Sequence, residues 1–243
     1  MKYINKQIQN EPSALRTFRN TTPNANYAGY SDKNTDTGEV HLLKKALLEE
    51  QGYLCAYCMR RINLELNRKN KPKVEVEHLK PRELYPNLDL NYMNMAGVCN
   101  GLSITYPENE EMHHCDKTKG REGKMSGQVE LRKLNPFDQN CERLITYRAN
   151  GQILALNDDE QVIYDLEKVL NLNNRALKDA RKAVVDNARK KLMKEKPIKQ
   201  WNKVFLRKHL EFWKTKNDQG EYNRFCMIAV WFIEKLLSKS KSN

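Results

Sequence analysis

Apolar side chains recur at helical spacing in two short segments of the first third of the chain. From His41 to Gln51, leucine and alanine residues fall on one face of a helix. Gly52 suits the left-handed position after a last helical turn, and Asp36 or Thr37 could cap the first turn. A shorter helix is predicted near Ser13–Arg19, because the proline just before it suits a helix start.

The last third of the chain shows the same periodicity almost without interruption. Helices are predicted over about 158–172, 173–196, 197–216 and 221–239. Asp158 or Asp159 suits the cap of the first, and Asn173 or Asn174 the cap of the second. Aromatic residues at helical spacing predict a buried stripe on the third helix: Trp201, Phe205, Phe212 and Trp213. The fourth should bury a second stripe, formed by Phe225, Ile228, Ala229, Phe232 and Leu236.

The middle of the chain has patterns typical of short strands. Lys73–His78 alternates as a strand does, and Pro81 and Pro86 mark a loop after it. A short helix is predicted over 115–124, so the order of elements is that of a ββα unit. Further along, apolar runs at 143–148 and 152–156 flank an Asn-Gly pair, which predicts a hairpin with a type I′ turn.

These elements indicate an α+β fold that is mostly α. We expect an N-terminal arm over 1–40, a core over 41–130, and a hairpin followed by a basic helical region over 131–243. The arm has scattered apolar residues among many polar ones. It could dock a partner, or it could lie as a strap across the core.

Charge and cysteine usage restrict the class of protein. The 243-residue chain has a formal net charge of +12 at pH 7, which favours a polyanionic partner such as nucleic acid. Its longest apolar run, 226–233, is far shorter than the roughly 20 residues of a membrane span. We therefore expect a cytoplasmic protein that does not bind membranes. Its six cysteines should then be reduced, and their spacing suggests a metal rather than disulfides.

Four of the cysteines are candidates for a structural zinc site. Cys55 and Cys58 form a C-x2-C turn, and Cys99 and Cys115 make the natural second pair, although fifteen residues separate them. His113 or His114 could replace one of the cysteines. Four protein ligands would close the site to chemistry and give it a folding role. The remaining two, Cys141 and Cys226, sit in apolar stretches and are predicted to be buried side chains without a metal.

Inside this cysteine frame lie residues suited to phosphodiester hydrolysis. Glu77 and His78 end the predicted strand, and Asp116 begins the predicted helix. A histidine can take a proton from water near pH 7, and one or two carboxylates can hold Mg²⁺. Adjacent strand residues point to opposite faces, so the first two can share a site only if the strand ends there, as Pro81 favours. Each residue alone has an ordinary structural explanation; their combination favours catalysis.

Positive charge is concentrated in the predicted helices near the end of the chain. Between Leu177 and Lys208 there are twelve Lys or Arg against three acidic residues, which could neutralise phosphates or form a solvated helix face. The residues that we expect to contact nucleic acid are Lys80, Lys117, Lys119, Arg181, Lys182, Lys190 and Lys191.

Over about residues 41–124, the chain resembles the zinc-containing HNH endonucleases of the ββα-metal class. The motifs that carry this resemblance are Cys55-x2-Cys58, Glu77-His78-x2-Pro81, Asn94, Cys99-Asn100 and Cys115-Asp116-x2-Lys119-Gly120. The chain departs from the family pattern in having Glu77 before the histidine, Asp116 after the last cysteine, and an insertion within the second cysteine pair.

The resemblance implies roles for individual residues. His78 would be the general base. Asn94 would brace the loop and orient the His78 side chain. Glu77 and Asp116 would hold one catalytic Mg²⁺ or Mn²⁺. Because the insertion follows Cys99 directly, Asn100 is a rival of Asp116 for this ion.

Four segments, two inside the core and two outside it, suggest a narrower resemblance. Segments 1–4, 50–59, 114–120 and 170–173 are similar to the HNH subunits of Septu anti-phage systems, which also occur with some retrons. This implies a DNA-cutting subunit in a hetero-oligomer with an ATPase. Two alternatives stay open: a zinc-dependent nucleic-acid-binding or adaptor subunit without catalysis, and a stand-alone restriction-type nuclease.

Overall fold

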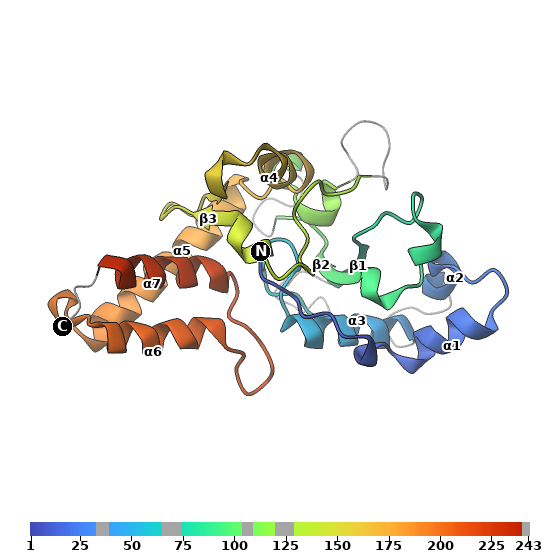
Figure 1. Ribbon diagram of the computed structural model, residues 1–243, viewed down its shortest axis with the longest axis horizontal. Helices are drawn as coiled ribbons and strands as arrows, with labels where there is room; N and C mark the ends of the chain where they lie inside the picture. The colour runs from blue at the N-terminus through green and yellow to red at the C-terminus, as the bar shows by residue number, and fades with distance from the viewer. Residues whose placement is uncertain (33–38, 65–73, 104–108, 120–128, 240–243) are drawn as a thin grey trace.

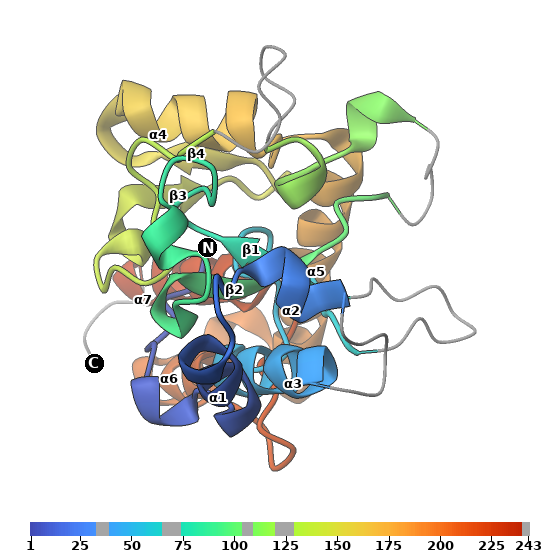
Figure 2. The same ribbon diagram turned by 90° about the vertical axis from the view of Figure 1, so that its right-hand side faces the viewer.

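Helices occupy both ends of the molecule, and short strands lie between them (Figure 1). Figure 2 views the molecule from the end that contains the first three helices. The computed structural model describes residues 1–32, 39–64, 74–103, 109–119 and 129–239. One end contains α1 (Ser13–Thr21), α2 (Tyr27–Asp32) and α3 (Glu39–Gln51). The other contains α5 (Arg175–Glu195), α6 (Lys203–Lys214) and α7 (Cys226–Lys239). Antiparallel pairs join β1 (Val74–His78) to β2 (Met95–Cys99), and β3 (Ile145–Tyr147) to β4 (Ile153–Ala155). The described fold is α+β and mostly helical, as predicted.

The helices α1 and α3 confirm the sequence prediction, whereas α2 was not predicted. Gly52 has φ of +62°, and a Cβ atom there would lie 2.4 Å from the ring of Tyr222. Glycine is therefore required both by the left-handed backbone and by the close approach of the chain before α7. The expected caps Asp36 and Thr37 lie outside the described residues.

The first six residues pack against the core. Met1 is fully buried, and the backbone N–H of Ile4 donates to the carbonyl of Pro136. The Lys6 ammonium lies 2.8 Å from Glu50, and both side chains are almost completely buried. These contacts are those of a strap across the core, one of the two alternatives for the N-terminal arm.

The pairing of β1 with β2 sets the position of the central motif. Glu77 lies opposite Ala96 and His78 opposite Met95, at the end of the ladder. After β2 come two 3-10 helices, at Glu110–Met112 and Cys115–Lys117; the second stands where the α-helix over 115–124 was predicted, and residues 120–124 lie outside the description. The two strands are thus present, whereas the helix expected for a ββα unit is described only as this single turn.

The second hairpin confirms the Asn-Gly signal but not its turn type. Gly151 has φ of +87°, whereas Asn150 does not have the positive φ that a type I′ turn requires. Arg148 and Gln152 pair through the backbone, and the Gly151 N–H donates to the Arg148 carbonyl. This pattern matches the hairpin loop that ends in a left-handed glycine.

The C-terminal helices follow the predicted caps more closely than the predicted bounds. Asp159 caps α4 (Glu160–Tyr164), which continues as a π-helix over Asp165–Val169, and Asn174 caps α5. The helices α6 and α7 begin several residues later than expected. The stripe on α7 is buried as predicted except for the half-buried Leu236, but the stripe on α6 is not, because Phe212 is 45% exposed.

One hydrophobic cluster includes side chains from each of the three predicted segments, among them Met1, Val98 and Phe232. The proposed boundaries near residues 40 and 130 therefore divide a shared core, and they stay a prediction. Among the described helices, none combines the length and the apolar character needed to cross a bilayer.

Candidate functional site

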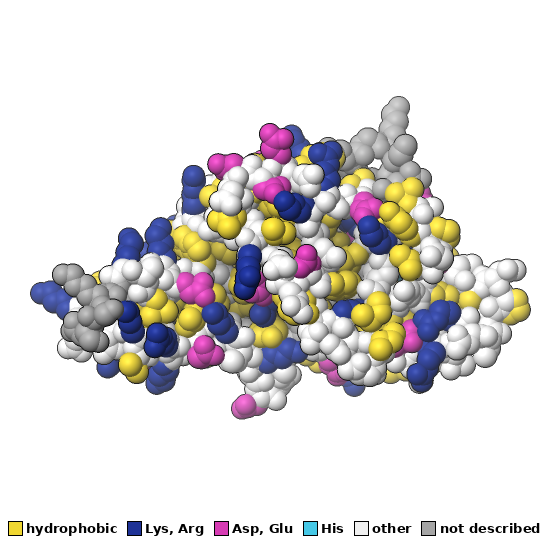
Figure 3. Space-filling view, viewed as in Figure 1, with side chains coloured by type: hydrophobic (Ala, Val, Ile, Leu, Met, Phe, Trp, Pro, Cys, Tyr) yellow, Lys and Arg dark blue, Asp and Glu magenta, His cyan; other side chains and the backbone are white. Residues whose placement is uncertain are grey.

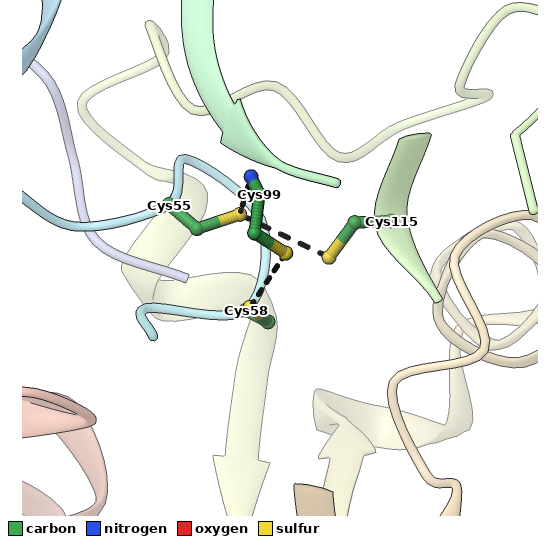
Figure 4. Close-up of side chains that lie close together, drawn as sticks. All are labelled: Cys55, Cys58, Cys99 and Cys115. Atoms are coloured by element: carbon green, nitrogen blue, oxygen red, sulfur yellow. Dashed lines mark hydrogen bonds between the residues drawn. The ribbon is translucent and has the colours of Figure 1, made fainter. Parts of the chain in front are cut away.

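The four predicted cysteines converge on one point in the core (Figure 4). Their sulfur atoms all lie within 4.8 Å of one another, and all four residues are buried. The Sγ atoms of Cys55 and Cys115 are 3.9 Å apart, and those of Cys58 and Cys99 are 3.8 Å apart. A tetrahedral zinc with Zn–S bonds of about 2.3 Å requires sulfur separations of about 3.8 Å. The cluster could therefore hold a metal ion such as zinc.

Local backbone geometry brings the split second pair together. After Cys99, Gly101 turns the chain with φ of +68°, and a Cβ atom there would lie 2.0 Å from the carbonyl oxygen of His114. The backbone N–H of His114 donates to the Gly101 carbonyl over 2.9 Å. This hydrogen bond joins the beginning and the end of the insertion. It therefore places Cys115 beside Cys99 despite their separation in sequence.

The histidines next to Cys115 are not members of the four-residue cluster. His114 is completely buried, and its Nδ1 atom lies 3.1 Å from the Cys115 sulfur. Burial and the nearby Arg60 guanidinium lower the pKa of His114 to about 3, so its ring is neutral. His114 can donate a hydrogen bond to a thiolate, which is the role of an outer partner to a metal site. Cys141 and Cys226 are buried outside the cluster, as predicted.

A second, open pocket adjoins this cluster and contains the predicted reacting groups. It has a volume of about 160 Å³. Its lining includes Glu77, His78, Asp116 and Lys119, with Pro81, Arg82 and Glu83 at its margin. The end of β1 at His78 lets two adjacent strand residues reach one pocket. Asn100 is not part of this lining; its side chain accepts a hydrogen bond from the Leu102 N–H instead.

Glu77 is held by donors from two other segments. The Tyr57 hydroxyl donates to Glu77 Oε1 over 2.8 Å, and the Lys119 ammonium binds the same oxygen. Asp116, which follows Cys115, lines the same pocket and has an exposed side chain; partial desolvation of its carboxyl group and the charge of Glu77 raise its pKa to about 7. Two facing carboxyl groups can share a proton or a cation. Their oxygen atoms suit Mg²⁺, which needs only one or two protein carboxylates.

His78 has the protonation state that a general base requires. Its Nε2 atom lies 2.8 Å from the carbonyl oxygen of Asp89, which can only accept, so Nε2 carries the proton and Nδ1 is free to accept one. Burial lowers the pKa of His78, and the Arg82 guanidinium acts in the same direction. The Tyr27 ring packs edge-on against the imidazole with centroids 4.7 Å apart.

Asn94 closes the loop that carries the Asp89 carbonyl. Its side-chain oxygen accepts from the Lys80 N–H over 2.8 Å, and its amide group donates to the carbonyls of Lys80 and Leu88. One buried amide therefore links the residues after His78 to the residues before Asp89. This geometry agrees with the bracing role that the family resemblance implies for Asn94.

Some of the residues predicted to contact nucleic acid are exposed, whereas others already bind groups within the protein. Lys117, Lys182, Lys190 and Lys191 are exposed. Lys80 is exposed but paired with Glu130. The prediction is wrong for Arg181, which is 1% exposed and donates to the carbonyls of Gly151 and Leu172. The Lys119 ammonium is also committed, to Glu77 and to the His78 carbonyl, rather than to the protein surface.

Sequence reasoning missed several residues that line this pocket or contact its side chains. Tyr57 lies inside the C-x2-C turn, a motif that indicates metal binding by the two cysteines and gives no role to the residues between them. Arg82 directly follows Pro81, so a basic residue four positions after the histidine was the available signal. Nothing in the local pattern around Tyr27 or Asp89 indicates that they approach His78, because those contacts depend on the fold.

Comparison with known proteins identifies two relatives. No family model matches the chain. It is 25% identical over 212 residues to the "Retron Ec83 putative HNH endonuclease" of Escherichia coli, covering 76% of this chain and 79% of that protein. It is 26% identical over 223 residues to "Septu protein PtuB" of Bacillus thuringiensis, covering 83% and 80%. The resemblance predicted from the motifs is confirmed by these names, and the similarity extends well beyond the cysteine frame.

Proposed function

We propose that the chain is a metal-dependent HNH endonuclease that hydrolyses phosphodiester bonds in DNA. The observation that carries this proposal is the neutral His78, held through Nε2 by the Asp89 carbonyl, in one pocket with the carboxyl groups of Glu77 and Asp116. The names of both relatives support the same class of enzyme at modest identity.

In this proposal the chain's own groups position and deprotonate the attacking water. A new P–O bond forms to the water oxygen, the bond to the leaving sugar oxygen breaks, and the water proton passes to His78 Nδ1. Glu77 and Asp116 would hold Mg²⁺ or Mn²⁺, which when bound supplies positive charge to the phosphate oxygens. Arg82, half exposed at the pocket margin, is a further candidate for contact with the phosphate.

The four cysteines would have a different task. With four sulfur ligands a zinc ion keeps no open position, so this metal would stabilise the fold without taking part in the reaction. Its loss should unfold the segment that carries Tyr57 and Asp116.

We further propose that the protein is the nuclease subunit of an anti-phage complex with an ATPase, as PtuB would be with a PtuA-like partner. The support is the printed name of the Septu relative and the retron origin of the other. A hetero-oligomer and a cytoplasmic location belong to the same proposal. A stand-alone nuclease would differ from it in cutting DNA without the ATPase.

The test is plasmid nicking with Mg²⁺ or Mn²⁺, with and without a PtuA-like ATPase. His78→Ala should lower the cleavage rate by about 100- to 10,000-fold, the usual contribution of a general base. His41→Ala, at a partly exposed histidine outside the pocket, is the matched control and should cut like the wild type. Equal rates for wild type and His78→Ala under every condition would refute the enzyme proposal.

One observation favours the alternative of a nucleic-acid-binding subunit without catalysis. The Lys119 ammonium occupies Glu77, one of the two carboxylates that would hold the catalytic ion. If wild-type protein binds DNA but neither binds Mn²⁺ nor cuts DNA in the presence of the ATPase, this alternative replaces the nuclease.

A further inference from the structure

Two residues that lie close to Glu77 are direct neighbours of cluster cysteines. Tyr57 directly precedes Cys58, and Asp116 directly follows Cys115. The Tyr57 hydroxyl donates to Glu77 Oε1 over 2.8 Å, and Asp116 lines the same pocket as Glu77. The four-sulfur cluster and the carboxylate pocket are therefore connected by side chains one residue away from a cysteine.

The position of the Tyr57 side chain is set by the turn that carries it and by its burial. It is completely buried, and the turn that carries it is closed by hydrogen bonds from Met59 N to Cys55 O and from Cys55 N to Arg60 O. A buried phenol hydroxyl needs a partner, and a carboxylate is a strong one. The direction of this hydroxyl thus limits where the Glu77 carboxyl group can lie.

The geometry at Glu77 assigns different tasks to its two oxygen atoms. Tyr57 and Lys119 both bind Oε1. With that oxygen engaged twice, Oε2 is the atom through which Glu77 can bind a cation together with Asp116. A glutamate has three side-chain torsions, so its orientation at the end of β1 depends on these donors as much as on the strand.

We propose that Tyr57 is a positioning residue for the catalytic metal. Its hydroxyl transmits the fixed geometry of the cysteine turn to Glu77 and thereby sets the affinity of the carboxylate pair for a divalent cation. The inference rests on the proposed nuclease function. It predicts that Tyr57 affects metal affinity while the rate at saturating metal changes little.

The experiment compares Tyr57→Phe with wild type by isothermal titration with Mn²⁺, together with zinc content and DNA cleavage. Removing a hydrogen-bond partner of a metal ligand typically weakens metal binding by 10- to 100-fold, and we expect about tenfold here. The Mg²⁺ concentration for half-maximal cleavage should rise by the same factor, with zinc content unchanged.

Tyr92→Phe provides a matched control. Tyr92 is also completely buried and donates its hydroxyl to a glutamate, Glu50, over 3.2 Å, but it does not line the pocket. It should lower the melting temperature about as much as Tyr57→Phe and leave Mn²⁺ affinity unchanged. If both variants bind Mn²⁺ like wild type, or both weaken it equally, the positioning role of Tyr57 is refuted. If wild type itself binds no Mn²⁺ and cuts no DNA, the proposed function fails instead.

Discussion

The cysteine cluster and the carboxylate pocket share one stretch of chain but differ in every property that governs metal choice. The cluster offers four buried sulfur atoms at tetrahedral separations, whereas the pocket offers oxygen atoms, a neutral imidazole and access for solvent. Soft thiolates suit zinc, and hard carboxylates suit Mg²⁺ or Mn²⁺. The difference shows how a small frame could separate an ion proposed to maintain the fold from an ion proposed to act on the substrate.

The strongest way to break this comparison is to remove a cluster ligand. Cys58→Ser should abolish binding of about one zinc per chain and lose the cooperative thermal transition, because metal binding and folding are coupled in such sites. Zinc is measured by mass spectrometry of the purified protein, and folding by circular dichroism. Cys141→Ser, at a buried thiol outside the cluster, should keep its zinc. A folded, zinc-containing Cys58→Ser protein would contradict the structural role.

Removing an oxygen ligand should affect only the pocket. Asp116→Asn should lower Mg²⁺-dependent cleavage by about 100-fold, the upper end of the loss seen when mere partners of metal ligands are removed. Asn100→Ala should cleave like wild type, because Asn100 is absent from the pocket lining. Cleavage rates and zinc content are measured together. The reverse result would make Asn100, rather than Asp116, the residue that binds the ion together with Glu77.

Changing the cation already at Glu77 sharpens the distinction further. Lys119→Met removes a buried ammonium from the carboxylate that would hold the catalytic ion. Mn²⁺ affinity should increase by about tenfold, since a positive charge a few ångströms away repels the ion. Without Mn²⁺ the variant should melt at a lower temperature, because Glu77 loses the partner of its buried charge. Weaker Mn²⁺ binding would instead make Lys119 a support of the site.

The smallest effect is expected far from both sites, on the basic surface of α5. Figure 3 shows Lys and Arg side chains gathered over the end of the molecule formed by α5–α7. Replacing Lys190, Lys191 and Lys194 by Gln should weaken DNA binding a few-fold and reduce the slope of log affinity against log salt by about 2 to 3. Fluorescence anisotropy at several salt concentrations measures both. Lys182→Gln, at a lysine paired with Asp186, should change the slope less.

The cysteine frame was predictable because its signal is local. Spacing in the sequence is enough to recognise the C-x2-C turn, the strand that ends at Glu77-His78, and the acidic residue after Cys115. The hairpin at Gly151 and the caps at Asp159 and Asn174 were predictable for the same reason, since each depends on a few neighbouring residues.

Contacts between distant segments were not predictable from one sequence. Arg181 reads as one more cation in a basic helix, yet it is buried against the carbonyls of Gly151 and Leu172. Tyr57 reads as a spacer between two cysteines, yet its hydroxyl reaches a carboxylate on β1. In both cases the partner lies in a different segment, so only the folded chain assigns the role.

The hydrogen bond between Gly101 and His114 also has a practical consequence for engineering. It links Gly101, close to Cys99, with His114, next to Cys115, and so helps to keep the last two cysteines together. Each doubling of a flexible loop costs only about 0.6 kcal/mol in closure entropy. A fluorescent domain inserted between these two residues should therefore cost little stability as long as their hydrogen bond is kept, and it would report on the protein in cells.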